Sequence, residues 1–389
     1  MLSFKLALRN LLGAGLRTWL NVVVLSFSFI IIIWTKGMLE GWDRQAKSDM
    51  IKWEIAGGQL WHINYDPYDP LSLDDSHGKF PPGLTFSSSQ PAVPVLITQG
   101  TIYPEGRMLS VLVKGIPPDQ KLLALPTDKL VNPDEEVPAI IGKTMAENAK
   151  LDTGDYVTLR WRDKNGTFDA KELKITAIFD TNVPTVDVGQ IWIPIDDLQS
   201  MMLLPGEATL IVTPENTGPI ETNDEWTFRD HKFLLADIES IIRAKGSVGM
   251  IVWLILLMMA MLAVFDTQVL SIFRRQKEIG TCVALGMTRG QVVKLFTMEG
   301  AMHSVLAAIV GAIYGIPLLL LQAKKGINIP LESSDFGLAM AEKLYPVYSA
   351  ALIAVTVLIV MTVTTIVSYW PSRKIAKLNP TEALRGRIQ

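Results

Sequence analysis

The chain contains a single cysteine, Cys282, among its 389 residues. The long polar stretch over residues 37–245 contains none, so an intrachain disulfide cannot hold it together. It has to fold around its own apolar core. With about 200 residues it is long enough to do so.

The chain also lacks the motifs of common catalytic sites. It has no G-x-x-x-x-G-K-[ST] phosphate-binding loop, no H-E-x-x-H and no zinc-type spacing of histidine and cysteine. Its four histidines, His62, His77, His231 and His303, are scattered. We therefore expect no catalytic residue, no metal site and no cofactor on this chain. A protein that moves, anchors or senses something is favoured over a membrane enzyme.

Charge is absent from four long apolar runs: Thr18–Thr35, Gly246–Phe265, Ala301–Ala323 and Leu344–Ser372. A helix needs about 20 apolar residues to cross the hydrocarbon core of a bilayer. Backbone polar groups find no partner in lipid, so each run has to be helical. The expected fold is an α-helical membrane protein with four transmembrane helices, one before and three after a large α+β extracytoplasmic domain.

The first apolar run has a basic start, which a cleaved signal peptide would also have. However, the run is long, and no small-residue cleavage site follows it. Trp34 and Lys36 at its end are typical of a helix leaving the membrane interface. We expect an uncleaved anchor.

The distribution of charge predicts the orientation. Residues 1–17, 274–299 and 373–389 together carry 13 basic and 3 acidic residues, whereas the rest of the chain carries 23 and 36. Four crossings place these three segments on one side of the membrane. By the positive-inside rule that side is the cytoplasm. The net charge of −3 conceals this asymmetry.

The runs and the charge pattern divide the chain into nine segments. They are a cytoplasmic-surface amphipathic helix (1–16), transmembrane helix 1 (17–36), the extracytoplasmic domain with stalks (37–245), transmembrane helix 2 (246–273), a cytoplasmic segment (274–299), transmembrane helix 3 (300–323), an outer loop (324–343), transmembrane helix 4 (344–372) and a cytoplasmic tail (373–389).

The extracytoplasmic domain mixes strand and helix patterns irregularly. Tyr156–Trp161 and Glu172–Phe179 alternate like strands, and Asn165-Gly166 between them favours a tight hairpin turn. Lys143–Lys150 and Ile195–Leu203 are predicted to be helical. Such a mixture indicates an α+β domain.

Two cytoplasmic segments carry the most specific patterns. In the first, the second transmembrane helix is predicted to continue from Ala236 past the basic cluster to Glu278 and on to Gly286, where glycine supplies a stop. Thr288 then caps a new helix that re-enters the membrane. In the second, the tail, Pro380 suits the first position of a short helix. The tail motif comprises Pro380, Glu382, Ala383, Leu384 and Arg385.

With these two motifs at the ends of a one-plus-three topology, the chain resembles the FtsX/MacB-type (type VII) ABC transporter permeases, which include the lipoprotein-releasing Lol permeases. The resemblance covers the whole length. It implies a bacterial inner-membrane protein with its large domain in the periplasm. It also implies an ABC ATPase subunit as partner, in two copies, which binds ATP and Mg, and a second permease copy or paralogue.

In this family the first cytoplasmic segment contains the coupling helix that docks on the ATPase. The residues that match it here are Glu278, Ile279, Gly280, Leu285, Gly286 and Arg289. Arg274 and Arg275 are interpreted as membrane anchors instead.

The sequence indicates less clearly which molecule, here called the client, such a transporter would act on. The size of the outer domain and the segment Gly58–Tyr65 are most similar to Lol-type permeases, so a lipoprotein is the first choice. Export of a peptide, antibiotic or other amphiphile, or ATP-driven regulation of a cell-envelope partner, stays open. Membrane lipid is an expected partner and nucleic acid is not. A membrane-anchored receptor is the alternative from another class, but it leaves the two cytoplasmic motifs unexplained.

Two features lie within the apolar runs themselves. Ala307, Gly311 and Gly315 form a stripe of small residues at helical spacing, which permits close packing within the chain or between two copies. Asp266 lies inside the second apolar stretch, about two turns before Arg274. A charge at a helix centre costs about 2.5–3.5 kcal/mol on insertion scales. A polar contact between helices is favoured for it over a role in coupling.

Overall fold

The computed structural model describes residues 16–81, 91–131, 136–215, 224–328 and 343–375. The chain forms two compact units. A helical unit contains the residues up to Trp42, Ile242–Ile327 and the residues from Leu344 onward, whereas a strand-bearing unit contains Asp43–Ile241 and Asn328–Lys343.

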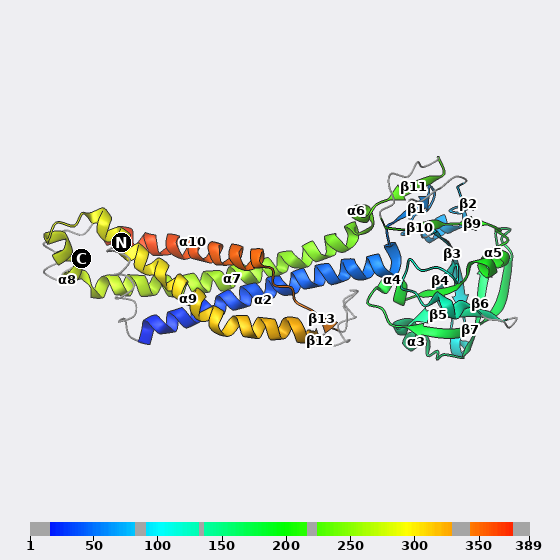
Figure 1. Cartoon of the computed structure of the whole chain (residues 1–389), viewed down its shortest axis with the longest axis horizontal. Helices are drawn as coiled ribbons and strands as arrows, with labels where there is room; N and C mark the ends of the chain where they lie inside the picture. Colours follow the sequence, from blue (N-terminus) through cyan, green and yellow to red (C-terminus); the bar gives the residue numbers. More distant parts are fainter. Residues whose placement is uncertain (1–15, 82–90, 132–135, 216–223, 329–342, 376–389) are drawn as a thin grey trace. The chain divides into compact units, whose positions relative to one another are not determined.

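Among the described residues, four helices are long and apolar enough to cross a membrane. They are α2 (Leu16–Met50), α7 (Ala236–Arg274), α9 (Arg289–Lys325) and α10 (Ala350–Ile375). In the helical unit they lie side by side, and the short helix α8 (Gln276–Ala284) follows α7 at one end (Figure 1). This confirms the predicted one-plus-three arrangement. α2, α7 and α9 extend beyond both ends of their apolar runs, whereas α10 begins inside its run and ends just after it.

The interior of this helical unit is apolar where α2 passes its neighbours. Val22, Leu25 and Phe29 of α2 are buried against residues of α7, α9 and α10. The small-residue stripe of α9 faces the same helix. A side chain on Gly311 would meet Ser26, and one on Gly315 would come within 2.8 Å of Ile30. The stripe therefore packs within the chain.

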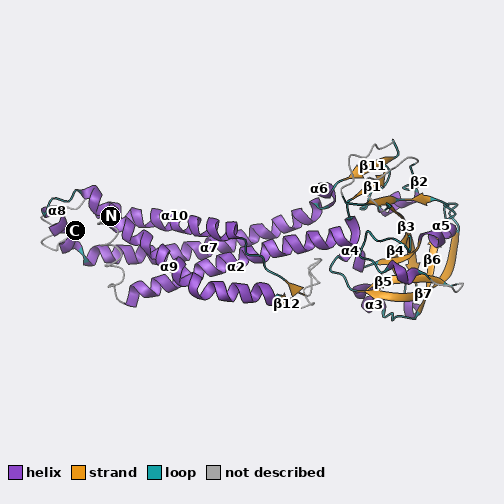
Figure 2. Cartoon of the chain, viewed as in Figure 1, coloured by secondary structure: helices purple, strands orange, loops and turns teal. Residues whose placement is uncertain are grey.

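Strands are concentrated in the other unit (Figure 2). Its nine-stranded sheet has the order β11-β1-β10-β3-β4-β8-β5-β7-β6. The strands are β1 (Gly58–His62), β3 (Val93–Ile102), β4 (Leu109–Ile116), β5 (Val137–Gly142), β6 (Tyr156–Arg162), β7 (Phe168–Phe179), β8 (Gln190–Pro194), β10 (Leu210–Thr213) and β11 (Trp226–Arg229).

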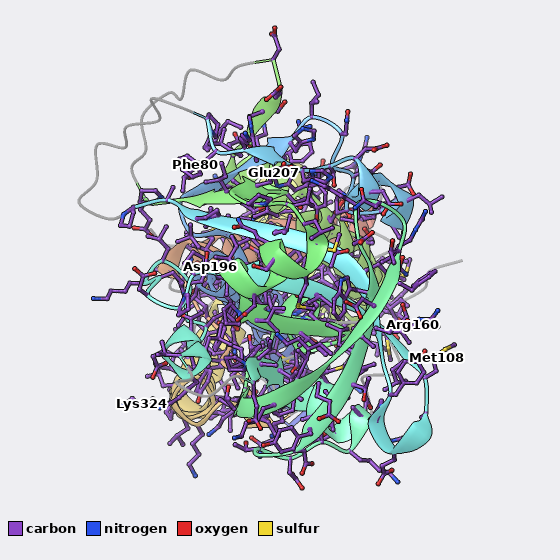
Figure 3. The ribbon with its side chains drawn as sticks, turned by 90° about the vertical axis from the view of Figure 1, so that its right-hand side faces the viewer. Phe80, Met108, Arg160, Asp196, Glu207 and Lys324 are labelled. Atoms are coloured by element: carbon purple, nitrogen blue, oxygen red, sulfur yellow. The ribbon has the colours of Figure 1, made fainter. Side chains whose placement is uncertain are left out.

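The sheet closes on itself because β3 pairs with both β4 and β6. Parallel pairs (β4 with β8, β5 with β7) mix with antiparallel ones. The enclosed core includes Ile102, Ile141, Leu159 and Ile193, and α5 (Ile195–Met202) packs against it through Leu198. Figure 3 shows the side chains of this unit, with Met108 and Arg160 at one edge. The predicted α+β class is confirmed.

The predicted hairpin is present, since β6 and β7 pair antiparallel from Tyr156 opposite Lys174 to Arg162 opposite Phe168. Gly166 has a φ of +84°, as the turn requires. The predicted helices correspond to α3 (Lys143–Ala149) and α5. The outer loop contains one short pairing that was not predicted, between β12 (Ile327–Asn328) and β13 (Lys343–Leu344).

Candidate functional site

The candidate coupling segment is built around α8, which lies between α7 and α9. The buried face of α8 presents Ile279 to a small apolar cluster with Ile272 of α7 and Val292 and Phe296 of α9. Val283 and Met287 pack against the same cluster. This cluster draws on three helices, so it packs α8 against the ends of two membrane helices.

The predicted continuous helix from α7 to Gly286 is wrong. The helix ends at Arg274, because Arg275 has a φ of −102° and a ψ of 19°, and α8 begins after it. The backbone N–H of Arg275 still donates to the carbonyl of Ser271 at 3.1 Å. α8 is therefore a separate short helix joined to α7 by a kink.

The Arg275 side chain occupies this kink. Its guanidinium donates to Glu299 of α9 at 2.9 Å and to Glu278 of α8 at 2.7 Å. It also lies over the ring of Phe296, 5.2 Å from the centroid. Although burial opposes the charge of Arg275, hydrogen bonds and charges from Glu278 and Glu299 raise its pKa, so the guanidinium stays protonated.

The interpretation of Arg275 as a simple membrane anchor was therefore incorrect. Its side chain is 24% exposed and that of Glu299 is 8% exposed, so the pair ties α8 to α9 in a partly dry environment. Sequence reasoning missed Glu299. The available signal was an acid directly before an apolar run, where insertion is costly unless the charge has a partner.

A small polar cluster lies next to this ion pair, where α7, α9 and α10 meet. Gln268 of α7, His303 of α9 and Ser368 of α10 are buried. A side chain on Gly300 would collide with Ser368 and would lie 3.0 Å from the amide of Gln268. Glycine at this position lets the three helices approach closely.

The turn after α8 has the predicted local chemistry. Gly286 has a φ of +100°, which favours glycine. The Thr288 side chain accepts from the N–H of Gln291, and the Gln291 side chain accepts in return from the N–H of Thr288, which is a capping box. α8 and α9 are thus separated by a turn with defined geometry.

The predicted coupling residues divide into a buried and an exposed set. Ile279 and Gly280 are buried, whereas Glu278, Gly286 and Arg289 are exposed. Leu285 is 86% exposed. A contact with another protein at this turn would remove this apolar surface from water. The tail motif, Pro380 to Arg385, and the amphipathic helix over residues 1–16, except for Leu16 in α2, lie outside the described residues.

Asp266 lies on an exposed face of α7, together with Leu262 and Leu270. The described part of the chain shows no hydrogen bond or ion pair for it. The polar contact expected for Asp266 is therefore not formed with the described residues of this chain.

The strand-bearing unit contains a cavity of about 910 Å³. Four basic residues and the acidic Glu215 line it, together with the apolar side chains of Ile51, Leu122 and Leu123. The basic residues are Arg44, Lys47, Lys52 and Lys121. Lys47 is paired with Asp43 at 3.0 Å and with Glu239 at 2.9 Å. This combination suits a ligand with both anionic and apolar parts.

Comparison with known proteins agrees with this architecture. Residues 250–380 match the family model described as FtsX-like permease C-terminal. Over 230 residues the chain is 25% identical to the macrolide export ATP-binding/permease protein MacB of Sodalis glossinidius, covering 54% of this chain and 32% of that protein. Over 276 residues it is 21% identical to the lipoprotein-releasing system transmembrane protein LolC of Xylella fastidiosa, covering 63% of this chain and 64% of that protein.

These alignments span less than two thirds of each relative's own length. Among solved structures, the extracellular domain of the ABC-type transporter YknZ is similar at 12% sequence identity and a TM-score of 0.25, covering 41% of this chain and 83% of that one.

The part of the chain that matches the family model contains most of α7 and the whole of α9 and α10, and it follows the large α+β domain. The chain is thus similar to permeases of the FtsX/MacB type of ABC transporter.

Proposed function

We propose that this chain is a non-catalytic permease subunit that couples ATP hydrolysis on a separate ABC ATPase to motion of its strand-bearing unit. The observation that carries the proposal is the arrangement of α8. It is fixed to α7 and α9 by the Arg275 ion pairs and the Ile279 cluster. The exposed Leu285 follows directly after α8, and Glu278 and Arg289 are exposed in the same segment.

A segment built like α8 can transmit a movement of the ATPase to the membrane helices. A short helix that docks on an ATPase moves with it, and the ion pair transmits this movement to α9. α7 starts in the strand-bearing unit at Ala236 and ends at the kink. A continuous helix is a stiff connection over this distance, since its backbone hydrogen bonds resist stretching.

The proposed client is an inner-membrane lipoprotein, which the domain in the periplasm would help to extract. The similarity to LolC supports this choice, and the basic and apolar lining of the large cavity suits an amphiphile. Export of a different amphiphile is the second candidate, which the similarity to MacB favours. The ATPase would be present in two copies and would bind ATP and Mg, and a second permease copy or paralogue would complete the transporter.

Reconstitution tests the client. The complex with its ATPase is placed in proteoliposomes that carry a triacylated lipoprotein, and release into the supernatant is measured with and without ATP. Lipoprotein release is expected to need ATP and to fall when Lys52 and Lys121 are both changed to Glu. ATP turnover without release of the lipoprotein, together with ATP-dependent efflux of a small amphiphile, would favour the second candidate.

A further inference from the structure

A second cavity, of about 590 Å³, lies in the helical unit between α9 and α10. Lys294 and Thr297 line it from α9, and Thr365, Tyr369 and Arg373 line it from α10. The three α10 residues are four apart, so they share one helix face. We call this cavity the α9–α10 groove.

Both cations lie at the same end of the groove. α9 and α10 run in opposite directions side by side (Figure 1), and they touch where Gly300 meets Ser368. Lys294 is six residues before this contact and Arg373 is five residues after it. At 1.5 Å per residue, these offsets are about 9 Å and 7.5 Å in the same direction along the antiparallel pair.

The groove is basic at this end and apolar along its wall. None of the described residues that line it is acidic, whereas Val293, Met298 and Ala301 supply apolar surface. Tyr369 is partly exposed, and its neighbour Trp370 is 72% exposed. Aromatic side chains of this kind gather at the level of lipid headgroups.

We propose that the α9–α10 groove binds one anionic phospholipid, with its headgroup phosphate between Lys294 and Arg373 and an acyl chain along Val293 and Met298. Basic pockets between membrane helices on the cytoplasmic side bind anionic headgroups. The charge pattern places this end of the helices on that side. The lipid is a resident ligand of the permease, and its binding does not depend on which client is transported.

Native mass spectrometry of the purified full chain in detergent tests the site directly. The delipidated chain is titrated with phosphatidylglycerol and, separately, with phosphatidylcholine. The wild type should retain one phosphatidylglycerol in preference to phosphatidylcholine. Lys294→Gln and Arg373→Gln should each weaken this retention about fivefold, the equivalent of about 1 kcal/mol for one cation near an anionic headgroup.

Two further variants separate the groove from general charge attraction. Lys324→Gln/Lys325→Gln removes two exposed cations from the other end of α9 and should leave retention unchanged (Lys324 is labelled in Figure 3). Thr297→Phe fills the groove without changing charge and should also weaken retention.

Three outcomes would overturn the proposal. The wild type and Lys294→Gln/Arg373→Gln could retain the lipid equally. Lys294→Gln/Arg373→Gln and the control Lys324→Gln/Lys325→Gln could lose the lipid alike. Alternatively, lipid retention could stay constant while Lys294→Gln/Arg373→Gln weakens association with a second permease or the ATPase. In that case the groove is a protein interface.

Discussion

The ion pair between Arg275 and Glu299 joins the start of α8 to α9, beside the apolar cluster around Ile279. Glu299→Gln keeps an oxygen acceptor but removes the negative charge of the most buried partner of Arg275, and it should lower the free energy of unfolding by about 1–3 kcal/mol. Glu278→Gln is the matched control, because it removes the charge of the other partner of the same guanidinium. Since the Glu278 side chain is 65% exposed, this change should cost less than about 1 kcal/mol.

Both free energies of unfolding are measured by titrating the purified chain, held in a mild detergent, with a denaturing detergent. Equal losses in the two variants would show that the buried partner is not the more important one.

Asp187 predicts a dependence of stability on pH in the strand-bearing unit. Its carboxylate accepts from the backbone N–H of Thr144 at 3.0 Å, near the start of α3. Burial raises the pKa of Asp187 despite this hydrogen bond. The unfolded chain therefore loses this proton at a lower pH than the folded chain, and stability falls as the pH rises from the unfolded pKa through the folded one.

Asp187→Asn keeps an oxygen acceptor for Thr144 and removes the titration. The variant should be more stable than the wild type at pH 7, and this gain should disappear as the pH falls below the ordinary aspartate pKa. Thermal unfolding of the full chain across the pH range measures it, with the exposed Asp119 changed to Asn as the control. A gain that persists unchanged in acid would contradict the explanation.

The turn between α8 and α9 depends on the conformation of Gly286. A side chain there would meet nothing within 4 Å, so the cost of Gly286→Val comes from its φ of +100° alone. We expect a loss of about 1–3 kcal/mol in the turn and weaker association with the ATPase, while the protein still inserts. Gly290→Ala is the control in the same segment. It lies in α9, also has free space, and should be neutral or stabilising by about 0.5–1 kcal/mol.

Assembly with the ATPase, measured by co-purification, and thermal stability are compared for both variants. If Gly286→Val assembles as well as Gly290→Ala, then the geometry of this turn is unimportant for docking.

These elements also show what local sequence could and could not predict. The capping box at Thr288, the hairpin at Gly166 and the four apolar helices follow from short-range chemistry, and all are confirmed. The kink at Arg275 was not predicted, because it coincides with an ion pair to a residue 24 positions away. The closure of the sheet through β3 and β6 likewise depends on pairing between distant strands.

For the molecule as a whole, the charge asymmetry predicts which side of the membrane each segment occupies. In a Cys282→Ala background, Asn165→Cys in the hairpin turn should react with an impermeant thiol reagent added to spheroplasts. Thr288→Cys should react only after the membrane is permeabilised. Labelling of Thr288→Cys in intact spheroplasts would reverse the proposed orientation.

The central claim is that α8 and its turn dock an ATPase, and co-purification tests it most directly. The tagged chain is purified from its native membrane, and ABC ATPase subunits are quantified by mass spectrometry. Leu285→Asp should lose most of the ATPase. Leu71→Asp changes a similarly exposed leucine in the strand-bearing unit and should retain it. If no ABC ATPase accompanies the wild-type chain, or if Leu285→Asp retains as much as Leu71→Asp, the account of coupling through α8 is wrong.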